Sequence, residues 1–276
     1  MISETEAQEL VESKNLITIG VKADEVRRRL HGTRTTFVRV FEIHLDRPAA
    51  TLPPRTSAGE FRLIGSPTSV QAAIDAVRTA RVLAGDVPVF GFSLADFVEL
   101  DGAASLRALR DAGLDGITEA PLDALQDPAS SIAAAREAGL VVACLTVNAG
   151  RGHDRGELAR QARTVQESVG GLRAFAPLPR MLSIASPTTG YDDVKQIALA
   201  RLIADNIASI QVDWQLYGPK LAQFALTVGA DDVDSVIAVD PGTLGTRRSP
   251  LEEIRGNIRS AGLDPVERNG RFEAIG

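Results

Sequence analysis

The segment RALRDAGLDGI, Arg107–Ile117, contains the pattern that decides the fold. It begins as a helix with a basic last turn, stops at Ala-Gly-Leu, and continues as an extended stretch. The glycine supplies the left-handed residue that closes a helix, and the leucine after it packs back onto that helix. The same pattern recurs in AAAREAGLVVACL, Ala133–Leu145, and in GNIRSAGLDPV, Gly256–Val266. Helix stops followed by strands are typical of a parallel α/β fold.

The same alternation extends along the whole chain. The expected strands are 36–44, 61–64, 87–92, 116–118, 141–147, 172–176, 210–214 and 235–239. The expected helices are 4–13, 19–30, 69–83, 103–111, 129–138, 154–169, 191–206, 219–228 and 250–260. No Ser/Gly-rich linker divides the chain, so we expect a single domain over residues 1–276. It has N-terminal helices at about 4–30 and a C-terminal helix plus extended tail at about 250–276.

Composition narrows the class of protein. A length of 276 residues suits one barrel of eight strand–helix units, and 44% hydrophobic residues can form its core. The net charge of −6 argues against a nucleic-acid surface. One cysteine excludes an intrachain disulfide and a cysteine-ligated cluster. The acidic start of the sequence shows no apolar signal region, and no uncharged stretch is long enough to cross a bilayer, so a cytoplasmic protein is expected.

The connection between the first two expected strands is short. Between His44 and Phe61 there are too few residues, and too many prolines, for a full crossover helix. Parallel neighbours usually need a connection of a dozen or more residues, mostly helical. Either the outer ring has lost one helix, or these two strands are not parallel neighbours. The features described next favour the first alternative.

Four stretches resemble one enzyme family. They are Ala23–Val38, the segment LRALRDAGLDGI, Tyr191–Val236 and Pro250–Ile275. Together they are similar to the radical S-adenosylmethionine enzymes of futalosine-dependent menaquinone synthesis, which include aminofutalosine synthase, dehypoxanthine futalosine cyclase and the deazaflavin FO synthases. The resemblance implies a (β/α) barrel of the radical S-adenosylmethionine (TIM-like) type. Here the first strand–helix crossover is shortened or lost.

The resemblance also implies an iron–sulfur cluster on a CxxxCxxC loop after the first strand. That loop would fall where EIHLDRPAATLPPRTS now stands, and none of its three cysteines is present. The family's glycine-rich segment after the fourth strand reads ITEAPLDAL here, Ile117–Leu125, which keeps Glu119 as an acid but has no glycine. We therefore expect no iron–sulfur cluster, weak or no binding of S-adenosylmethionine, and no other cofactor.

Candidate ligand-binding residues lie at or near the ends of predicted strands, where barrel active sites gather. They are His44, Glu119, Asn148, His153, Trp214 and Tyr217. Each also has a structural interpretation, such as a helix N-terminal charge partner for Glu119, a turn residue for Asn148 and core packing for Trp214. No catalytic residue is assigned.

Two other features receive structural interpretations. Cys144 is expected to be a small buried residue facing the core or the barrel interior. Asp231, Asp232 and Asp234 resemble a metal cluster in composition. They have no second ligand set, so turn chemistry between helix and strand is expected and no metal site is predicted.

Two classes of function follow from these expectations. The first is a cluster-less pseudoenzyme related to aminofutalosine synthase, acting as a non-catalytic accessory, regulatory or intermediate-binding subunit in futalosine-type menaquinone synthesis. The alternative is a redox-free lyase or hydrolase that acts on a nucleoside-like or aromatic small molecule, with Glu119, His44 or His153 as general acid or base. Expected partners are a second copy or an active family member, contacted through Pro48–Ser57, and a small nucleoside-like ligand. Neither nucleic acid nor a membrane is expected as a partner.

Overall fold

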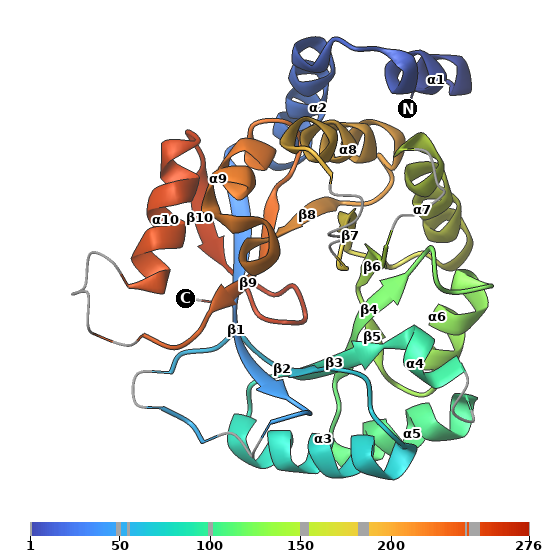
Figure 1. Ribbon diagram of the computed structural model, residues 1–276, viewed down its shortest axis with the longest axis vertical. Helices are drawn as coiled ribbons and strands as arrows, with labels where there is room; N and C mark the ends of the chain where they lie inside the picture. The colour runs from blue at the N-terminus through green and yellow to red at the C-terminus, as the bar shows by residue number, and fades with distance from the viewer. Residues whose placement is uncertain are drawn as a thin grey trace.

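The computed structural model shows a barrel of parallel strands with helices around it (Figure 1). It describes residues 2–47, 51–53, 56–98, 102–149, 155–181, 188–240, 242 and 249–275. The strands of the wall are β1 (Arg34–His44), β2 (Glu60–Ile64), β3 (Val89–Ser93), β4 (Gly116–Pro121), β5 (Val141–Val142), β6 (Cys144–Val147), β7 (Ala174–Pro179), β8 (Ser209–Asp213) and β9 (Asp232–Ile237).

Pairing between β1 and β9 closes the sheet. The strands β5 and β6 both pair with β4, one above the other, so together they fill one position in the wall. The described strands therefore form a closed parallel barrel of eight positions, and the expected fold class is confirmed. A further strand, β10 (Asp264–Glu267), pairs with β1 outside this circuit.

Most of the expected helices are present. They are α1 (Glu4–Glu12), α2 (Leu16–His31), α3 (Val70–Ala84), α5 (Gly102–Ala112), α6 (Pro128–Glu137), α7 (Arg155–Val169), α8 (Gly190–Ile203), α9 (Trp214–Leu226) and α10 (Pro250–Ser260). The short helix α4 (Leu94–Val98) was not expected from the sequence. None of the described helices is both long and apolar enough to span a bilayer.

The connection from β1 to β2 has no helix in its described residues, as the short spacing predicts. Its last part instead runs in extended form beside the end of β9. Thr56 forms an antiparallel bridge with Val239, and the Ser57 N–H donates to the Ala238 carbonyl at 3.0 Å. The strands there are nevertheless covered, because Phe41 and Ile43 are only 7% and 8% exposed. The exposed apolar surface at this connection is therefore small among the described residues, with Leu52 as its main exposed residue at 47%.

Arginines in the last turns of the helices tie neighbouring units together at the amino-terminal end of the barrel. Each donates to a carbonyl in the C-terminal turn of the following unit: Arg81 to Gly113, Arg136 to Gly170 and Arg201 to Gly229. A cation at this place also stabilises the negative end of its own helix. Of these three arginines, Arg136 is the basic residue that precedes Ala-Gly-Leu, whereas Arg81 and Arg201 stand at equivalent helix ends before Val-Leu-Ala-Gly and Leu-Ile-Ala-Asp.

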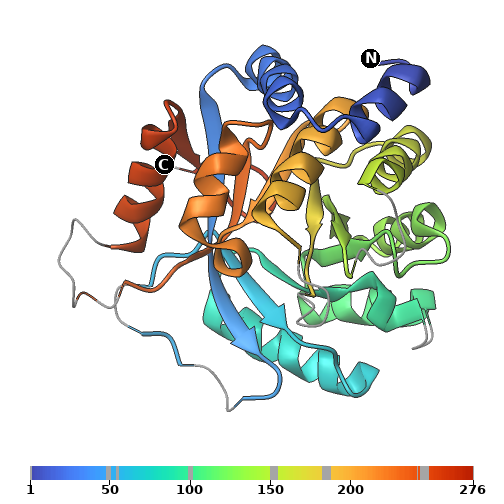
Figure 2. The same cartoon turned by 45° about the horizontal axis from the view of Figure 1, so that its top comes forward.

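The two N-terminal helices lie beside the barrel, where α2 packs against α8 (Figures 1 and 2). Buried residues of α1, α2 and the barrel helices belong to one hydrophobic cluster, which reaches from Ala7 to Leu263 along the sequence. This cluster lies between the strands and the helices. The side chains on the inner face of the wall are largely polar, and they form the candidate site.

Candidate functional site

A buried arginine, Arg62, lines a small cavity inside the barrel together with Asp234, Cys144 and Arg268. It comes from β2 and donates to Glu60 at 2.5 Å and to the two carboxylate oxygens of Asp234 at 2.8 and 3.0 Å. All three residues are at most 5% exposed. Burial alone would raise the pKa of Asp234, but the charge of Arg62 and its hydrogen bonds hold that pKa well below its usual range. The pair is therefore ionised inside the protein.

A bulge in β9 places two successive side chains against Arg62. Ser235 has a φ of 58°, and the register with β1 shifts across this position. A bulge directs consecutive residues to the same side of a sheet, which regular strands cannot do. As a result the Ser235 hydroxyl accepts from Arg62 at 3.0 Å, next to Asp234. Non-glycine residues with positive φ carry strain, and such strain clusters at functional sites.

A second arginine, Arg180, follows β7 at the carboxyl end of the barrel. It donates to Asp213, the last residue of β8, and to Asp234 at 3.4 Å. Asp213 also accepts from the Ser235 hydroxyl at 2.9 Å, so the two arginines belong to one network. Burial alone would lower the pKa of Arg180, but the charges of Asp213 and Asp234 outweigh burial and raise it.

Glu119 on β4 is the acid of this site that has no fixed partner. Its carboxylate is half-buried and has no hydrogen-bond partner among the described residues. Burial raises the pKa of Glu119, although the charges of Arg180 and Arg62 act in the opposite direction. A carboxyl group with a raised pKa beside a fixed arginine can bind a ligand donor or exchange a proton.

Several buried polar atoms on the same side of the lumen are also unpartnered. Among the described residues, the hydroxyls of Thr118 and Thr146 and the Nε of Arg180 have no hydrogen-bond partner. They lie on or just after β4, β6 and β7, which are consecutive in the wall. On the opposite side, Glu60 of β2 and Asp234 and Ser235 of β9 are instead paired with Arg62. An unpaired buried polar group costs about 1–3 kcal/mol, so this side is where a ligand or ordered water gains most.

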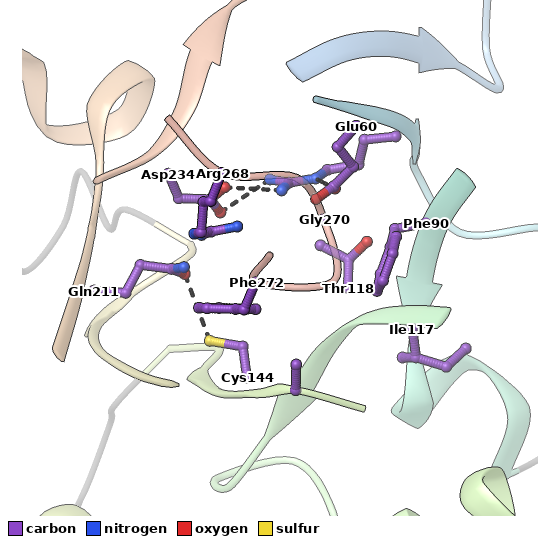
Figure 3. A pocket seen from close by; sticks show the side chains of 12 residues that line it. Glu60, Phe90, Ile117, Thr118, Cys144, Gln211, Asp234, Arg268, Gly270 and Phe272 are labelled. Atoms are coloured by element: carbon purple, nitrogen blue, oxygen red, sulfur yellow. Dashed lines mark hydrogen bonds and ion pairs between the residues drawn. The ribbon is translucent and has the colours of Figure 1, made fainter. Parts of the chain in front are cut away.

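Below Arg62 the lumen is filled. A cavity of about 20 Å³ remains between Arg62, Thr118, Cys144 and Phe272, which is room for about one water. Figure 3 shows Gln211, Cys144 and Phe272 close together on the inner side of the wall. A ligand larger than one water therefore has to lie on the carboxyl-terminal side of Arg62, beside Glu119 and Arg180.

The other predicted site residues are placed apart from this network. His44, at the end of β1, has its Nε2 3.3 Å from Glu42 Oε2 and faces a separate hollow lined by Gly65 and Pro67. Asn148 is held by its backbone N–H, which donates to Asp123 at 2.6 Å. His153 lies outside the described residues.

The two aromatic candidates have structural contacts. Trp214 is 9% exposed and belongs to the hydrophobic core at the start of α9. The Tyr217 hydroxyl donates to the Pro179 carbonyl at 2.7 Å, and burial raises its pKa. Among the described candidates, Glu119 and Tyr217 are both influenced by the charge of Arg180 in the buried network, and Glu119 also by that of Arg62. The ligand role of all six stays a prediction.

The aspartates near β9 do more than the turn role expected from the sequence. Asp231, Asp232 and Asp234 are buried, and each pairs with a different arginine: Arg201, Arg268 and Arg62 respectively. The turn interpretation was incomplete because the arginines are 30 to 172 positions away along the chain. The signal for Arg62 was present in Glu-Phe-Arg-Leu of β2, where charges at alternate positions face one side of a strand.

The residues do not fit an iron–sulfur cluster. Cys144 is buried in the lumen, and its thiol lies 3.5 Å from Gln211 Oε1. Burial raises the pKa of Cys144 to about 12, whereas a ligating cysteine must be a thiolate. Among the described residues, no group of three or more His, Cys, Asp or Glu side chains could hold a metal ion. The sequence has no other cysteine to complete a ligand set.

Comparison with known proteins identifies the relatives of this chain. Residues 175–275 match the family model of the CofH/MqnC C-terminal region. Aminodeoxyfutalosine synthase of Streptomyces coelicolor is 32% identical over 134 residues, which is 41% of this chain and 35% of that protein. Cyclic dehypoxanthine futalosine synthase of the same organism is 31% identical over 196 residues, 62% of this chain and 49% of that protein.

The fold is shared with solved structures. Methylornithine synthase (PylB) superposes with a TM-score of 0.67 at 15% identity, covering 96% of this chain and 94% of that one. The FeFe-hydrogenase maturase HydG from Carboxydothermus hydrogenoformans gives a TM-score of 0.69 at 11% identity, covering 98% and 77%. The expected relationship to the futalosine-pathway family is confirmed. The chain spans between a third and a half of the two Streptomyces relatives.

Proposed function

We propose that this chain, whose residues 175–275 match the CofH/MqnC C-terminal region, is a cluster-less relative that binds a small molecule without radical chemistry. It acts as an accessory or intermediate-binding protein in a futalosine-type pathway. One observation carries the proposal: the connection after β1 has no cysteine, and the single thiol is buried in the lumen with a raised pKa.

The proposed binding site lies at the carboxyl end of the barrel. Glu119 supplies an unpaired acceptor, Arg180 supplies an unpaired Nε donor, and Thr146 supplies a buried hydroxyl. A ligand with both a hydrogen-bond donor and an acceptor matches this set, because each unpaired group then gains a partner. The small molecules named by the relatives, aminodeoxyfutalosine and cyclic dehypoxanthine futalosine, are the first probes to use.

S-adenosylmethionine is not expected to bind tightly. In the family its amino-acid end is held partly by the cluster iron, for which this chain has no cysteine ligands. Pro121 ends β4 and has no N–H to donate to a ligand carboxylate. Its carbonyl accepts instead from Leu125 at 3.1 Å in a turn.

The test is calorimetric titration of each probe into the wild-type chain and two variants. Glu119→Ala removes the unpaired acceptor and is expected to weaken binding by about 1–3 kcal/mol, or roughly 5- to 150-fold. Glu167→Ala, an exposed glutamate of α7, is the matched control and should leave binding unchanged. Equal affinity in all three proteins would contradict a site at Glu119.

A second candidate, a redox-free enzyme, is favoured by the raised pKa of Glu119. A carboxyl group protonated closer to neutral pH is suited to general acid catalysis. The two functions differ in one outcome, which is whether a bound probe is recovered unchanged. Conversion by the wild type but not by Glu119→Gln supports the enzyme, whereas binding with full recovery supports the accessory role.

A further inference from the structure

The segment 268–272 enters the lower part of the lumen, where Arg268, Gly270 and Phe272 line the small cavity. The wall explains how the segment comes to be there. β1 is long enough to have two partners on the same edge. Arg34 to Phe37 pair with β10, and Val40 to His44 pair with β2. β10 therefore lies on the amino-terminal side of β2 along the same edge of β1. β2 already occupies the place in the wall into which β10 would continue. The chain turns inward at Arg268, and Figure 1 shows the last segment inside the ring of strands.

Two glycines allow the inward turn. The Gly270 N–H donates to the Gly59 carbonyl at 3.1 Å, where the segment passes the start of β2. A Cβ atom on Gly59 would lie 2.6 Å from the Arg268 carbonyl oxygen, and one on Gly270 would lie 2.8 Å from the Glu60 carboxylate. The close approach is therefore possible only without side chains at these positions.

The segment folds back as a small turn held by its own residues. Asn269 Oδ1 accepts from the N–H groups of Arg271 and Glu273 at 2.9 and 3.1 Å. Arg268 and Ala274 form an antiparallel bridge. The turn presents two side chains to the lumen, Arg268 and Phe272, and the guanidinium of the first lies 3.8 Å from the ring centroid of the second.

The lumen contains a preformed contact site for each of these side chains. Asp232 accepts from Arg268 at 2.6 and 2.7 Å. The same carboxylate also accepts from Thr36 and from Gln211, so it is oriented independently of the arginine. The Phe272 ring packs against Cys144, Ala174 and Ala176, a cluster separate from the main core.

We propose that the lower lumen is a binding site for a short segment that carries an arginine and, four positions later, an aromatic residue. The chain fills this site with its own Arg268 and Phe272. Three contacts provide the recognition. The Asp232 carboxylate binds the guanidinium through two hydrogen bonds, the small residues Cys144, Ala174 and Ala176 pack against the ring, and a cation–π contact joins the guanidinium to the ring. The bound segment closes the barrel at its amino-terminal end and keeps Cys144 covered.

Cys144 makes the occupancy measurable, because it is the single thiol of the sequence and Phe272 covers it. The rate of its labelling by a thiol reagent is measured for the full-length wild type and for Phe272→Ala. Removing the ring is expected to raise the labelling rate by about tenfold or more, which corresponds to roughly 1.4 kcal/mol of easier access. Phe224→Ala, at an exposed phenylalanine of α9, is the matched control with an unchanged rate. Circular dichroism of each variant verifies the fold, and Phe272→Leu replaces Phe272→Ala if the latter unfolds.

The chemical class of the ligand is tested by filling the space left in Phe272→Ala. Toluene should restore protection of Cys144, and should do so at least about threefold better than methylcyclohexane, because only the aromatic ring interacts with the Arg268 guanidinium. Equal protection of Cys144 by both compounds would indicate a nonspecific apolar cavity and would contradict a site that prefers an aromatic ring. Fast labelling of the wild type, or no acceleration in Phe272→Ala, would contradict the proposed occupancy.

Discussion

Arg62 of β2 and Asp234 of β9 form a bidentate ion pair with N–O distances of 2.8 and 3.0 Å. β1 lies between these two strands in the wall, so the pair crosses the inside of the barrel over β1. Both side chains are buried, and Arg180 and Ser235 extend the pair toward the carboxyl end of the barrel. A hydrophobic lumen would be the simpler way to fill a barrel of this size. The retained charges instead give the interior a fixed polar surface on which a ligand can be oriented.

Asp234→Asn should destabilise the protein by about 3–5 kcal/mol, because it leaves two buried arginines short of a counter-charge. Urea unfolding at neutral pH measures the change. Asp75→Asn, at an exposed aspartate 3.6 Å from Arg78, is the control and should change stability by less than about 0.5 kcal/mol. A loss below about 1 kcal/mol for Asp234→Asn would show that the pair is not important for the fold.

The same pair predicts an acid dependence. The folded-state pKa of Asp234 lies below its unfolded value of 3.8, so the unfolded chain binds more protons in that range. The stabilisation by Asp234 is therefore complete above about pH 4 and is lost as the pH falls through the folded-state pKa. Free energies of unfolding of wild type and Asp234→Asn should converge on acidification, and parallel curves would contradict this.

Glu119→Gln should stabilise the protein at neutral pH. Burial raises the pKa of Glu119 above its usual value of 4.5, so the folded state binds the proton more tightly than the unfolded state. The wild type therefore loses stability as the pH rises from that value through the folded-state pKa, and the variant does not. The comparison is of thermal midpoints between pH 4 and pH 8, with Glu167→Gln as an exposed control. A variant less stable than the wild type at pH 7 would assign Glu119 a structural role.

Gly270→Ala should cost about 1–3 kcal/mol because its Cβ would lie 2.8 Å from Glu60 Oε2 and 2.9 Å from the Phe90 ring. Gly256→Ala is the opposite case, since Gly256 is inside α10 with no atom within 4 Å of its Cβ position. That change should stabilise by about 0.5–1 kcal/mol. Urea unfolding of both variants compares the two signs directly, and equal effects would argue against a tightly fitted segment in the lumen.

Leu52→Asp should weaken self-association or association with an active relative, if the short β1–β2 connection is a contact surface. Leu52 is 47% exposed there and Thr56 anchors the connection to Val239. The change adds a charge without opening the core, so the fold should persist. Analytical ultracentrifugation measures the association, with Val82→Asp on α3 as a control at an exposed site elsewhere. A wild-type protein that stays monomeric at high concentration and does not co-purify with an active relative would contradict the proposed association.

Much of the fold followed from the sequence because its signals are local. The helix stop at Gly113, with Leu114 packed behind it, and the short connection after His44 each depend on neighbouring residues. The interrupted wall position at β5 and β6 and the short helix α4 were not predicted. Both features depend on strand register and tertiary packing, which a run of apolar residues in the sequence does not determine.

The site was less predictable. Glu119 was found because it directly follows a predicted strand, whereas Arg180 and Asp213 were missed because each looks like an ordinary charged residue within or just after a strand. Their meaning depends on tertiary pairing, because the adjacent strands β7, β8 and β9 bring Arg180 and Asp213 to Asp234. The closure of β1 onto β9 then brings in Arg62. The entry of Phe272 into that lumen depends on β10 lying below β2, and no local pattern in the tail indicates this.

We expect this chain to bind no iron–sulfur cluster, and anaerobic reconstitution with iron and sulfide measures this directly. Iron and acid-labile sulfide are then measured per chain after desalting, alongside the absorbance of thiolate–iron bands. Cys144→Ser provides a control without any thiol. We predict the same background for wild type and Cys144→Ser, because one buried thiol with a raised pKa cannot form the ligand set. A stoichiometric cluster in the wild type, including one shared between two copies, would contradict it.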